Sequence, residues 1–532
     1  MLQRLSDLIA SPPPSPPEEQ HLSASEAATR WWGRALIVAA LLALPALVVS
    51  FPPVTDLPQH LAQIRLLFDG AGEVGSPYRV AWFAPNGLFY YLAIVVWSLL
   101  GPELSGPALT VIVVASWTWA CFALARRTGG SWPSALLASL CVFSVPLYWG
   151  FFNFLVGWPV FVGFFLVAWG PLTLRRWFGI LAMSGLLWTA HALWFALACI
   201  CLVLVALAER DRWLPTLMKM SAMLPIGIMS LFWFVQLRSE WTSGGLSQGP
   251  FWFTTPLQRM APTKWIADGL VGAVSSSGGV FDLAAAVSMI CLIWVVVAFG
   301  VWIRRTRGRG SWAFVLPGCV MGFVYAFGPS EYLNTIAFEL RWLPLALAWF
   351  LCVLPPPVPL HPTIKAAVAL AFVLMVAETT LAWRDFDQVD MSGLEDALAM
   401  VDPGDRVLGL DFRRLDNRFG TFAFMQVQAY AAAYRGATTN FSFASHASSL
   451  VRYREPPEHP WTPLIEWRAQ TVQLRDFLYF DKALVNLPEE QHARFARQPW
   501  VRPMTTNGHW RAYEILHEQV RSQLELAPKP PP

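Results

Sequence analysis

Charged residues are scarce in this chain of 532 residues. Only 14% are Asp, Glu, Lys or Arg, whereas 55% are hydrophobic and the mean hydropathy is +0.44. Soluble globular domains carry about 25% charged residues, so this scarcity excludes a protein that water alone solvates. Apolar stretches near the length that spans a bilayer recur between residues 35 and 383. The composition therefore predicts an all-α polytopic domain of roughly 10–12 transmembrane helices in the lipid bilayer.

Cysteine is also sparse, and its positions exclude a disulfide framework. The seven cysteines fall within or beside apolar stretches, and none lies after residue 383. They show no zinc-ligand spacing. No soluble segment carries a basic stripe interleaved with aromatic residues, so we expect no nucleic-acid partner.

Arginine runs predict the orientation of the helices. Segments such as "ARRTGG" and "IRRTRGRG" lie between apolar stretches and belong on the cytoplasmic side. We expect a disordered cytoplasmic N-terminus at 1–30, a transmembrane domain at 31–383, and outer loops at 51–87, 237–282 and 329–342. The long apolar stretch 177–208 is expected to form two short helices that turn near His191.

One region does not obey the positive-inside rule, which places arginine-rich loops on the cytoplasmic side. Crossings at 88–101 and 107–125 would place Arg126 and Arg127 on the outer side. Either "GPELSGP" breaks one crossing or one of the two stretches is re-entrant, and the sequence leaves both explanations open.

The composition changes after residue 383. Residues 384–520 hold much of the charge, and strand patterns such as "RVLGLDF" and "HWRAYEIL" follow helical ones. We expect a small extracytoplasmic α/β domain here, followed by a disordered Pro-rich tail at 521–532.

The segment "TDLPQHLAQIRLLF" in the first outer loop is the leading candidate for a functional site. Its apolar residues recur at helical spacing at Leu57, Leu61, Ile64 and Phe68, which predicts a helix lying on the outer membrane surface. Asp56 and His60 are four residues apart and share the opposite face. A structural alternative is that Asp56 only caps this helix.

Other polar residues fall near the same predicted membrane face. Asn153 and His191 lie at outer helix ends, Lys264 with Asp268 in the second outer loop, and Glu339 with Arg341 in the third. Each has an ordinary explanation as a packing or anchoring residue. Together they suit chemistry on a lipid-borne phosphate, with a carboxylate as general base or ligand of Mg²⁺ or Mn²⁺. Arg341 and Lys264 would neutralise the phosphate, and Asn153, His191 and Glu339 would contact substrate.

This arrangement resembles the GT-C glycosyltransferase superfamily, which includes protein O-mannosyltransferases and lipid A aminoarabinose transferases. The phrase "FPPVTDLPQHLA" in particular resembles uncharacterised bacterial membrane proteins of this type. The resemblance implies an inverting enzyme of the bacterial inner membrane with a polyprenyl-phosphate-linked sugar as donor. The acceptor would be a glycan, lipid or protein, and the catalytic outer-loop carboxylate would be Asp56.

The segment departs from the family pattern in one respect. Many members pair two adjacent acidic residues in this loop, whereas Asp56 stands between Thr55 and Leu57. His60 is the candidate second partner. Two other classes stay open: a transporter or flippase, and a non-catalytic scaffold of envelope polysaccharide assembly. The scaffold would bind glycans through residues 434–454, which carry arginines at 435, 452 and 454 and His446.

Overall fold

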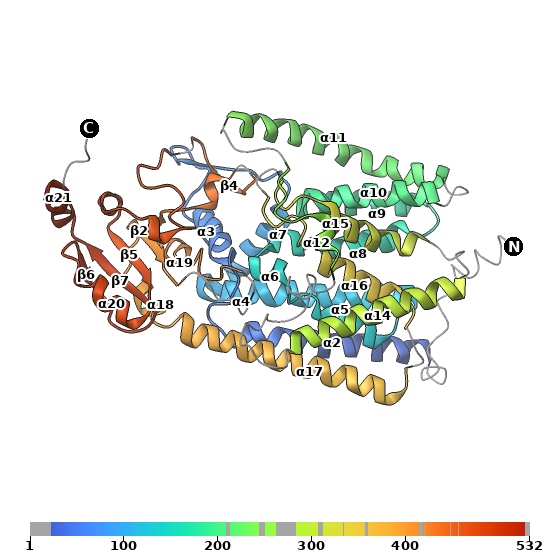
Figure 1. The fold of residues 1–532 in the computed structure, drawn as a ribbon. Coiled ribbons are helices and arrows are strands. Elements are labelled where there is room, and N and C mark those ends of the chain that lie inside the picture. The colour runs from blue at the N-terminus through green and yellow to red at the C-terminus, as the bar shows by residue number, and fades with distance from the viewer. Residues whose placement is uncertain are drawn as a thin grey trace.

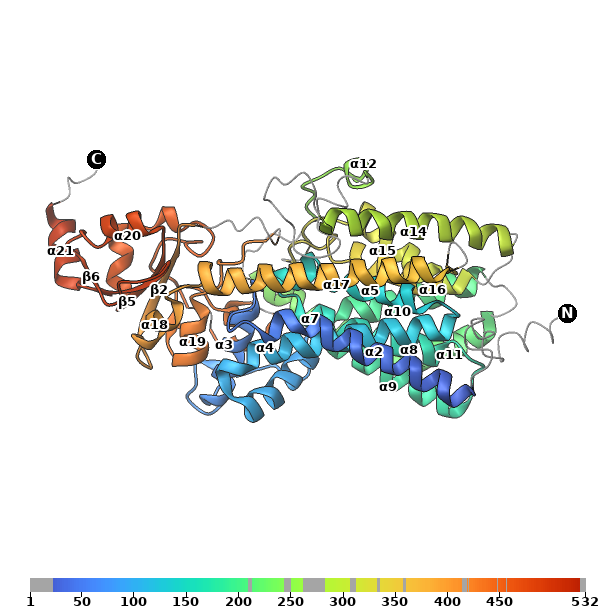
Figure 2. The same cartoon turned by 90° about the horizontal axis from the view of Figure 1, so that it is seen from below.

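The helices form one elongated bundle, and a mixed sheet caps one of its ends (Figure 1). A computed structural model describes residues 23–208, 213–243, 250–261, 283–306, 312–332, 335–356, 360–413, 419, 421–446, 448–455 and 457–526. Figure 2 shows the same arrangement from below, with α17 running along the bundle toward the sheet. The predicted fold class, a helical membrane domain followed by a small α/β domain, is confirmed.

The bundle contains long and short apolar helices. Within the described ranges, six helical stretches are long and apolar enough to cross a membrane, and four shorter apolar helices accompany them. The protein is therefore a multi-pass membrane protein. The helices are α2 (Ala24–Leu47), α4 (Gly87–Thr128), α5 (Trp132–Leu140), α6 (Val145–Trp149), α7 (Phe152–Leu155), α8 (Gly157–Ala168), α9 (Leu174–Ala190), α10 (Ala192–Ala208), α11 (Trp213–Ser243), α12 (Pro256–Arg259), α14 (Leu283–Thr306), α15 (Leu316–Phe327), α16 (Leu343–Val353) and α17 (Pro362–Asp385).

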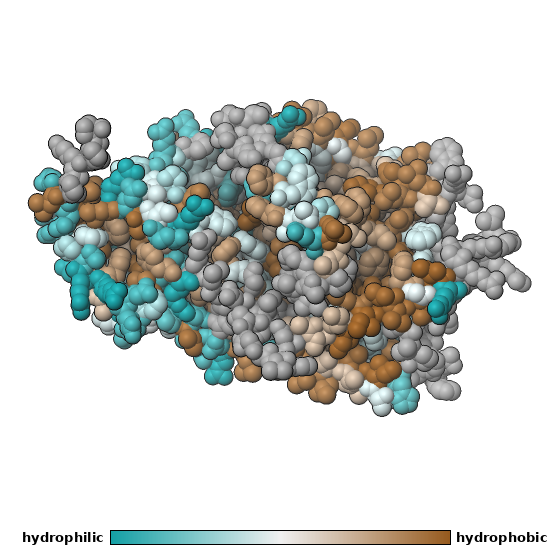
Figure 3. All heavy atoms as spheres, in the orientation of Figure 1, coloured by the Kyte–Doolittle hydropathy of each residue, from teal (hydrophilic) through white to brown (hydrophobic). Residues whose placement is uncertain are grey.

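The surface separates the two parts by polarity. Hydrophobic residues cover much of the visible helical half of the molecule, whereas hydrophilic residues dominate the surface of the sheet domain (Figure 3). This division follows from the surroundings of each part. Lipid contacts the outer faces of the helices, whereas the polar surface of the sheet domain needs water.

The first half of α4 does not cross the bundle. Its Trp97 ring stacks at 6.1 Å on the Phe68 ring of α3 (Leu57–Phe68), so the two segments run side by side. Gly101 then breaks the helix with a φ of 78° and a ψ of 175°. At Gly106 the chain is again next to α3, because a Cβ there would lie 3.3 Å from Leu57. This geometry supports the re-entrant explanation.

The second half of α4 crosses to the opposite end. The Arg126 guanidinium lies 5.9 Å from the ring centroid of Trp32 in the first turns of α2. Arg34 likewise lies over the ring of Trp132 at 5.4 Å. These arginines therefore share one end of the bundle, which removes the conflict with the positive-inside rule.

The structure tests three of the expected element boundaries. The division of 177–208 at His191 is confirmed, because α9 ends at Ala190 and α10 begins at Ala192. The expected disorder at 1–30 is wrong for residues 24–30, which begin α2 because Ser23 and Glu26 form a capping box. The expected tail at 521–532 is wrong for residues 521–526, which belong to α21 (His517–Leu526).

The C-terminal domain is built on a five-stranded sheet of order β3-β2-β5-β7-β6. The central strands β2 and β5 are parallel, and β7 pairs antiparallel with β5. The strands are β2 (Arg406–Asp411), β3 (Thr438–Thr439), β5 (Lys482–Asn486), β6 (Val501–Pro503) and β7 (Trp510–Ile515), and the helices are α18 (Leu394–Ala399), α19 (Ala429–Arg435), α20 (Glu489–Phe495) and α21. Short helical turns also occur: η3 (Trp312–Phe314), η4 (Phe386–Asp390), η6 (Phe443–Ser445), η7 (Ala469–Thr471) and η8 (Leu474–Tyr479).

A second, two-stranded sheet connects the domains. Its β1 (Tyr78–Val80) comes from the first outer loop and pairs antiparallel with β4 (Val451–Tyr453) of the C-terminal domain. The same interface encloses α3, which contacts α4 on one side and α19 on the other.

The prediction that the apolar residues of α3 face lipid is wrong. Leu57, Leu61 and Ile64 are all 0% exposed, and only Phe68 at the helix end reaches the surface. The stripe is buried because protein rather than lipid covers it: α4 lies against Leu57 and Leu61. The helix therefore lies inside the protein, between the bundle and the C-terminal domain.

Candidate functional site

Asp56 immediately precedes α3 but does not cap it. Its backbone adopts an αR conformation, and its side chain makes no capping hydrogen bond. The backbone is instead anchored to α6, since the Asp56 N–H donates to the Trp149 carbonyl at 3.1 Å. Thr55 likewise donates to the Tyr148 carbonyl at 2.9 Å. The carboxylate accepts no hydrogen bond from any described residue, so the capping explanation does not account for an aspartate here.

Gly150 brings the bundle against this carboxylate. It ends α6 with a φ of +84°, a conformation that side chains rarely tolerate. A Cβ at this position would lie 2.9 Å from the Cβ of Asp56. The close approach fixes the backbone of Asp56 between α3 and the α6–α7 turn.

His60 lies one turn into α3 and is fully bonded. Its Nε2 lies 3.0 Å from the Gly150 carbonyl oxygen, and its Nδ1 lies 2.9 Å from the Tyr90 hydroxyl. A carbonyl only accepts, so Nε2 carries the proton and Nδ1 accepts from Tyr90. Burial lowers the pKa of His60 to about 4, which keeps this imidazole neutral. Both ring nitrogens thus hold neighbouring elements together.

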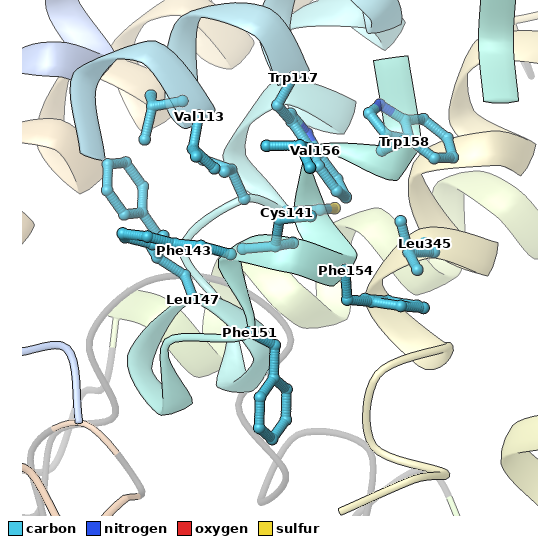
Figure 4. Packing of buried hydrophobic residues seen from close by; sticks show 14 of the residues in the cluster. Val113, Trp117, Cys141, Phe143, Leu147, Phe151, Phe154, Val156, Trp158 and Leu345 are labelled. Carbon is cyan, nitrogen blue, oxygen red and sulfur yellow. The ribbon is translucent and has the colours of Figure 1, made fainter. Parts of the chain in front are cut away.

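Arg341 enters the site from the loop before α16. Its guanidinium carbon lies 3.6 Å from the ring centroid of Phe151, a cation–π contact. Its Nη2 donates to the Ile336 carbonyl at 3.0 Å, while its buried Nε has no partner among the residues that the structure describes. Figure 4 shows Phe151 extending away from the other labelled side chains of the core, so that one of its ring faces is available to Arg341.

Asp56 and Arg341 influence each other electrostatically. Burial raises the pKa of Asp56 to about 7, and the Arg341 guanidinium limits that increase. Burial lowers the pKa of Arg341 to about 9, an effect that the carboxylates of Asp56 and Glu339 oppose. At neutral pH the guanidinium stays charged while the carboxylate is poised to exchange a proton. Asp56 also keeps some accessible surface although protein surrounds it.

The remaining described candidates lie around this pair. Asn153 is next to the Tyr90 hydroxyl, which is itself within electrostatic range of Asp56. His191 packs edge-on against Phe154 at 5.5 Å, and its charged form is disfavoured by burial and by Arg341. Glu339 is an ion-pair partner of Arg259 at 3.6 Å.

The structure thus brings together Asp56, His60, Asn153, His191, Glu339 and Arg341. Lys264 and its neighbour Asp268 lie outside the described residues.

Sequence reasoning missed two residues that organise the site. Tyr90 sits inside an apolar stretch, where its hydroxyl gave no signal of a link to His60. Arg259 is buried and bonds to Thr254 Oγ1 at 2.7 Å, to Ser330 Oγ at 2.6 Å and to the Gly328 carbonyl. It therefore ties α12 to the loop that carries Glu339 and Arg341.

The C-terminal domain covers the site through segment 434–454. The Phe443 ring packs edge-on against the His60 ring at 5.6 Å. The arginines assigned to glycan binding in the scaffold hypothesis bond to backbone: Arg435 to the Val401 carbonyl at 2.9 Å and Arg454 to the Ser76 carbonyl at 2.9 Å. The segment packs on α3 more than it presents a basic surface.

The residues around Asp56 do not fit a divalent cation. No described group of three or more His, Cys, Asp or Glu could hold a metal ion. Asp56 lies close to a guanidinium, and the neighbouring His60 uses both nitrogens. Mg²⁺ in proteins takes oxygen ligands, commonly one or two carboxylates with substrate phosphates, and an adjacent fixed cation opposes its binding. We therefore derive no step through Mg²⁺ or Mn²⁺.

No protein-family model and no curated protein matches this sequence. Among solved structures, ArnT from Cupriavidus metallidurans bound to undecaprenyl phosphate is similar at a TM-score of 0.52 and 12% identity, over 92% of this chain and 98% of that one. The apo state of ArnT is similar at a TM-score of 0.54 and 12% identity, over 93% of this chain and 99% of that one. The mycobacterial arabinofuranosyltransferase AftD is similar at a TM-score of 0.41 and 15% identity, over 90% of this chain and 40% of that one. The match to ArnT shows that this chain shares the fold of ArnT, as the resemblance to the GT-C superfamily predicted.

Proposed function

We propose that this protein transfers a sugar from a polyprenyl-phosphate carrier to an acceptor at the outer face of a bacterial inner membrane. The observation that carries the proposal is Asp56: a carboxylate with no bond from any described residue, within electrostatic range of Arg341, whose pKa burial raises to about 7. A general base works best with a pKa near the operating pH. The binding of undecaprenyl phosphate by ArnT, which shares the fold, supports a lipid-linked donor.

The reaction assigned to this geometry is one displacement. The acceptor oxygen attacks the anomeric carbon while Asp56 takes the hydroxyl proton. The bond between the anomeric carbon and the phosphate oxygen breaks, and the polyprenyl phosphate leaves with the electron pair. Attack opposite the leaving group inverts the anomeric configuration. Arg341 stabilises the phosphate charge that develops, as a fixed cation in a poorly hydrated site does.

The other residues position these groups in our proposal. His60 holds Gly150 and Tyr90 and thereby fixes the backbone beside Asp56, which makes it a positioning residue. Asn153, His191 and Glu339 contact substrate hydroxyls or orient Arg341, and Lys264 adds a second cation for the phosphate.

The test is turnover by the purified full chain in liposomes, with a panel of polyprenyl-phosphate sugars as donors. We expect Asp56→Asn to lower turnover by about 10²–10⁴-fold, the usual contribution of a general base. Asp69→Asn is the matched control, because Asp69 follows the other end of α3 and pairs with Arg65 at 2.8 Å. Unchanged turnover in Asp56→Asn would show that Asp56 is not the base. Donor binding without turnover by the wild type would favour the scaffold.

A further inference from the structure

A cavity lies where the end of α11 meets the two-stranded sheet. Its volume is about 370 Å³, and it is separate from the residues around Asp56. Figure 1 shows the end of α11 next to the loop that contains β1 and to β4. Three segments line the cavity: the outer loop at Arg79, Val80, Ala81, Trp82, Phe83 and Ala84, the end of α11 at Trp233, Gln236 and Leu237, and β4 at Arg452.

Two arginines give this cavity its charge. Arg79 and Arg452 are direct partners across the antiparallel β1–β4 ladder, so their side chains leave the same face. Arg452 is only 8% exposed and is fixed by its Nε bond to the Ser449 carbonyl at 2.8 Å. Like charges directly opposite one another are unfavourable in a ladder. Both arginines have further contacts in the protein, and an anion shared between them would add to these.

Aromatic rings form the rest of the wall. Trp82 and Phe83 are 46% and 91% exposed, and Trp233 faces the same cavity from α11. Tryptophan side chains favour the headgroup layer of a bilayer, where one edge is apolar and the other is wet. Arginines beside such rings match a ligand with a charged head and an apolar body.

The exterior of α11 connects this cavity to lipid. Residues 214–238 form a candidate membrane span of which little is buried inside the protein. Apolar side chains recur along its exposed surface at helical spacing, at Leu224, Ile228, Leu231, Phe232 and Val235. The cavity begins at the last turns of this stripe. A lipid that follows the stripe with its chains would therefore bring its headgroup to the two arginines.

We propose that this cavity binds the phosphate of a membrane lipid headgroup, as a site distinct from the one at Asp56. The inference goes beyond the proposed function and does not depend on it, because a protein without transferase activity would still bind such a lipid. A phospholipid and a polyprenyl phosphate share this chemistry, so the experiment separates them.

The test is equilibrium binding of pyrene-labelled phosphatidylglycerol to the purified full chain in detergent. Arg79→Gln is the main variant because Arg79 is exposed, so its replacement does not disturb a core. We expect about 5–10-fold weaker binding, the scale of one charge-assisted contact, and a smaller loss for pyrene-labelled phosphatidylcholine, whose ammonium group offsets the charge of its phosphate. Arg454→Gln is the control, since Arg454 lies on the same chain segment but does not line the cavity. Trp82→Leu serves as a second variant and should weaken binding of both lipids.

Each arm decides one point. If undecaprenyl phosphate displaces the probe from the wild type at much lower concentrations than unlabelled phosphatidylglycerol does, the preferred lipid is the carrier, and the proposal stands for that source. If inorganic phosphate displaces the probe at concentrations equal to those of the lipids, the ligand is a free anion and the lipid proposal fails. Equal binding by wild type and Arg79→Gln overturns the site.

Discussion

The start of α3 and the rest of that helix differ in how their polar side chains are bonded. Gln59 accepts from the Phe443 N–H at 3.0 Å and donates to Gln426 at 3.0 Å, and Gln63 accepts from the Val451 N–H at 2.8 Å. His60 uses both ring nitrogens. Asp56, one turn earlier, has a fixed backbone but no hydrogen bond to its carboxylate from the described residues.

This difference distinguishes the polar residues that hold α3 in place from the one that is available for a reaction. Buried polar groups in proteins are nearly always hydrogen-bonded, because an unbonded one costs free energy. Gln59 and His60 follow that rule, and Gln63 follows it only through its amide oxygen, because its buried Nε2 has no partner among the described residues. The Asp56 carboxylate is fixed, keeps some accessible surface and has no bond from the described residues, and we infer that it is kept to take the acceptor proton.

After Asp56 itself, the largest expected effect concerns the guanidinium of Arg341. Arg341→Met should lower turnover by about 10²–10³-fold, because one fixed electrostatic contact to the developing charge is lost. Arg341→Lys should recover part of this, since it keeps the charge but loses the planar guanidinium. Arg384→Met, an exposed arginine at the end of α17, is the control. Steady-state kinetics with the lipid-linked donor would measure all three, and equal rates for wild type and Arg341→Met would remove Arg341 from the reaction.

The next effect is a pH dependence that belongs to Asp56 alone. The base must be ionised to take a proton, so kcat/KM should rise with pH and level off above about pH 7. Below that value the rate should fall about tenfold per pH unit. Because Arg341 limits the increase in the pKa of Asp56, the residual activity of Arg341→Met should level off at a higher pH. A profile that is flat between pH 5 and 8 would contradict the assignment.

His60 should affect stability more than chemistry. His60→Phe leaves the Gly150 carbonyl and the Tyr90 hydroxyl without the imidazole, which should destabilise the fold by about 1–3 kcal/mol. Its folded pKa of about 4 lies below the usual 6.5, so the contribution of His60 to the free energy of unfolding should fall as the pH drops from 6.5 toward 4, whereas the raised pKa of Asp56 contributes with the opposite sign. The difference in stability between wild type and His60→Phe should therefore shrink as the pH falls, whereas the difference between wild type and His459→Phe, in an exposed loop, should change less. Thermal unfolding of the detergent-solubilised protein across this range measures both effects.

Much of the helical fold was predictable from apolar runs and arginine positions. The break at His191 could be predicted because a histidine is costly at mid-membrane. The covering of α3 could not, since the spacing of Leu57, Leu61 and Ile64 shows one apolar face but not whether lipid or protein lies against it. The short strands β3 and β6 gave no periodic signal over two or three residues.

The candidate site was predictable in its parts and not in its geometry. Asp56, Asn153, His191 and Arg341 were identified because polar residues gathered at one predicted membrane face. Their mutual positions depend on Gly150, whose close contact with Asp56 no local pattern reveals. The division of labour between Asp56 and His60 depends on hydrogen bonds to Tyr90 and Gly150, which only the folded chain brings together.

The smallest expected effects test whether the glutamines of α3 serve only to attach the C-terminal domain. Gln59→Leu removes bonds to Gln426, to the Phe441 carbonyl and to the Phe443 N–H. It should destabilise this contact by about 1–2 kcal/mol, and Gln63→Leu, which removes one accepted bond, by about 1 kcal/mol. Hydrogen exchange should show faster exchange in residues 441–451 for both variants, with turnover falling less than for Asp56→Asn. If either glutamine variant lost turnover as fully as Asp56→Asn, hydrogen bonding on α3 would not distinguish attachment from catalysis.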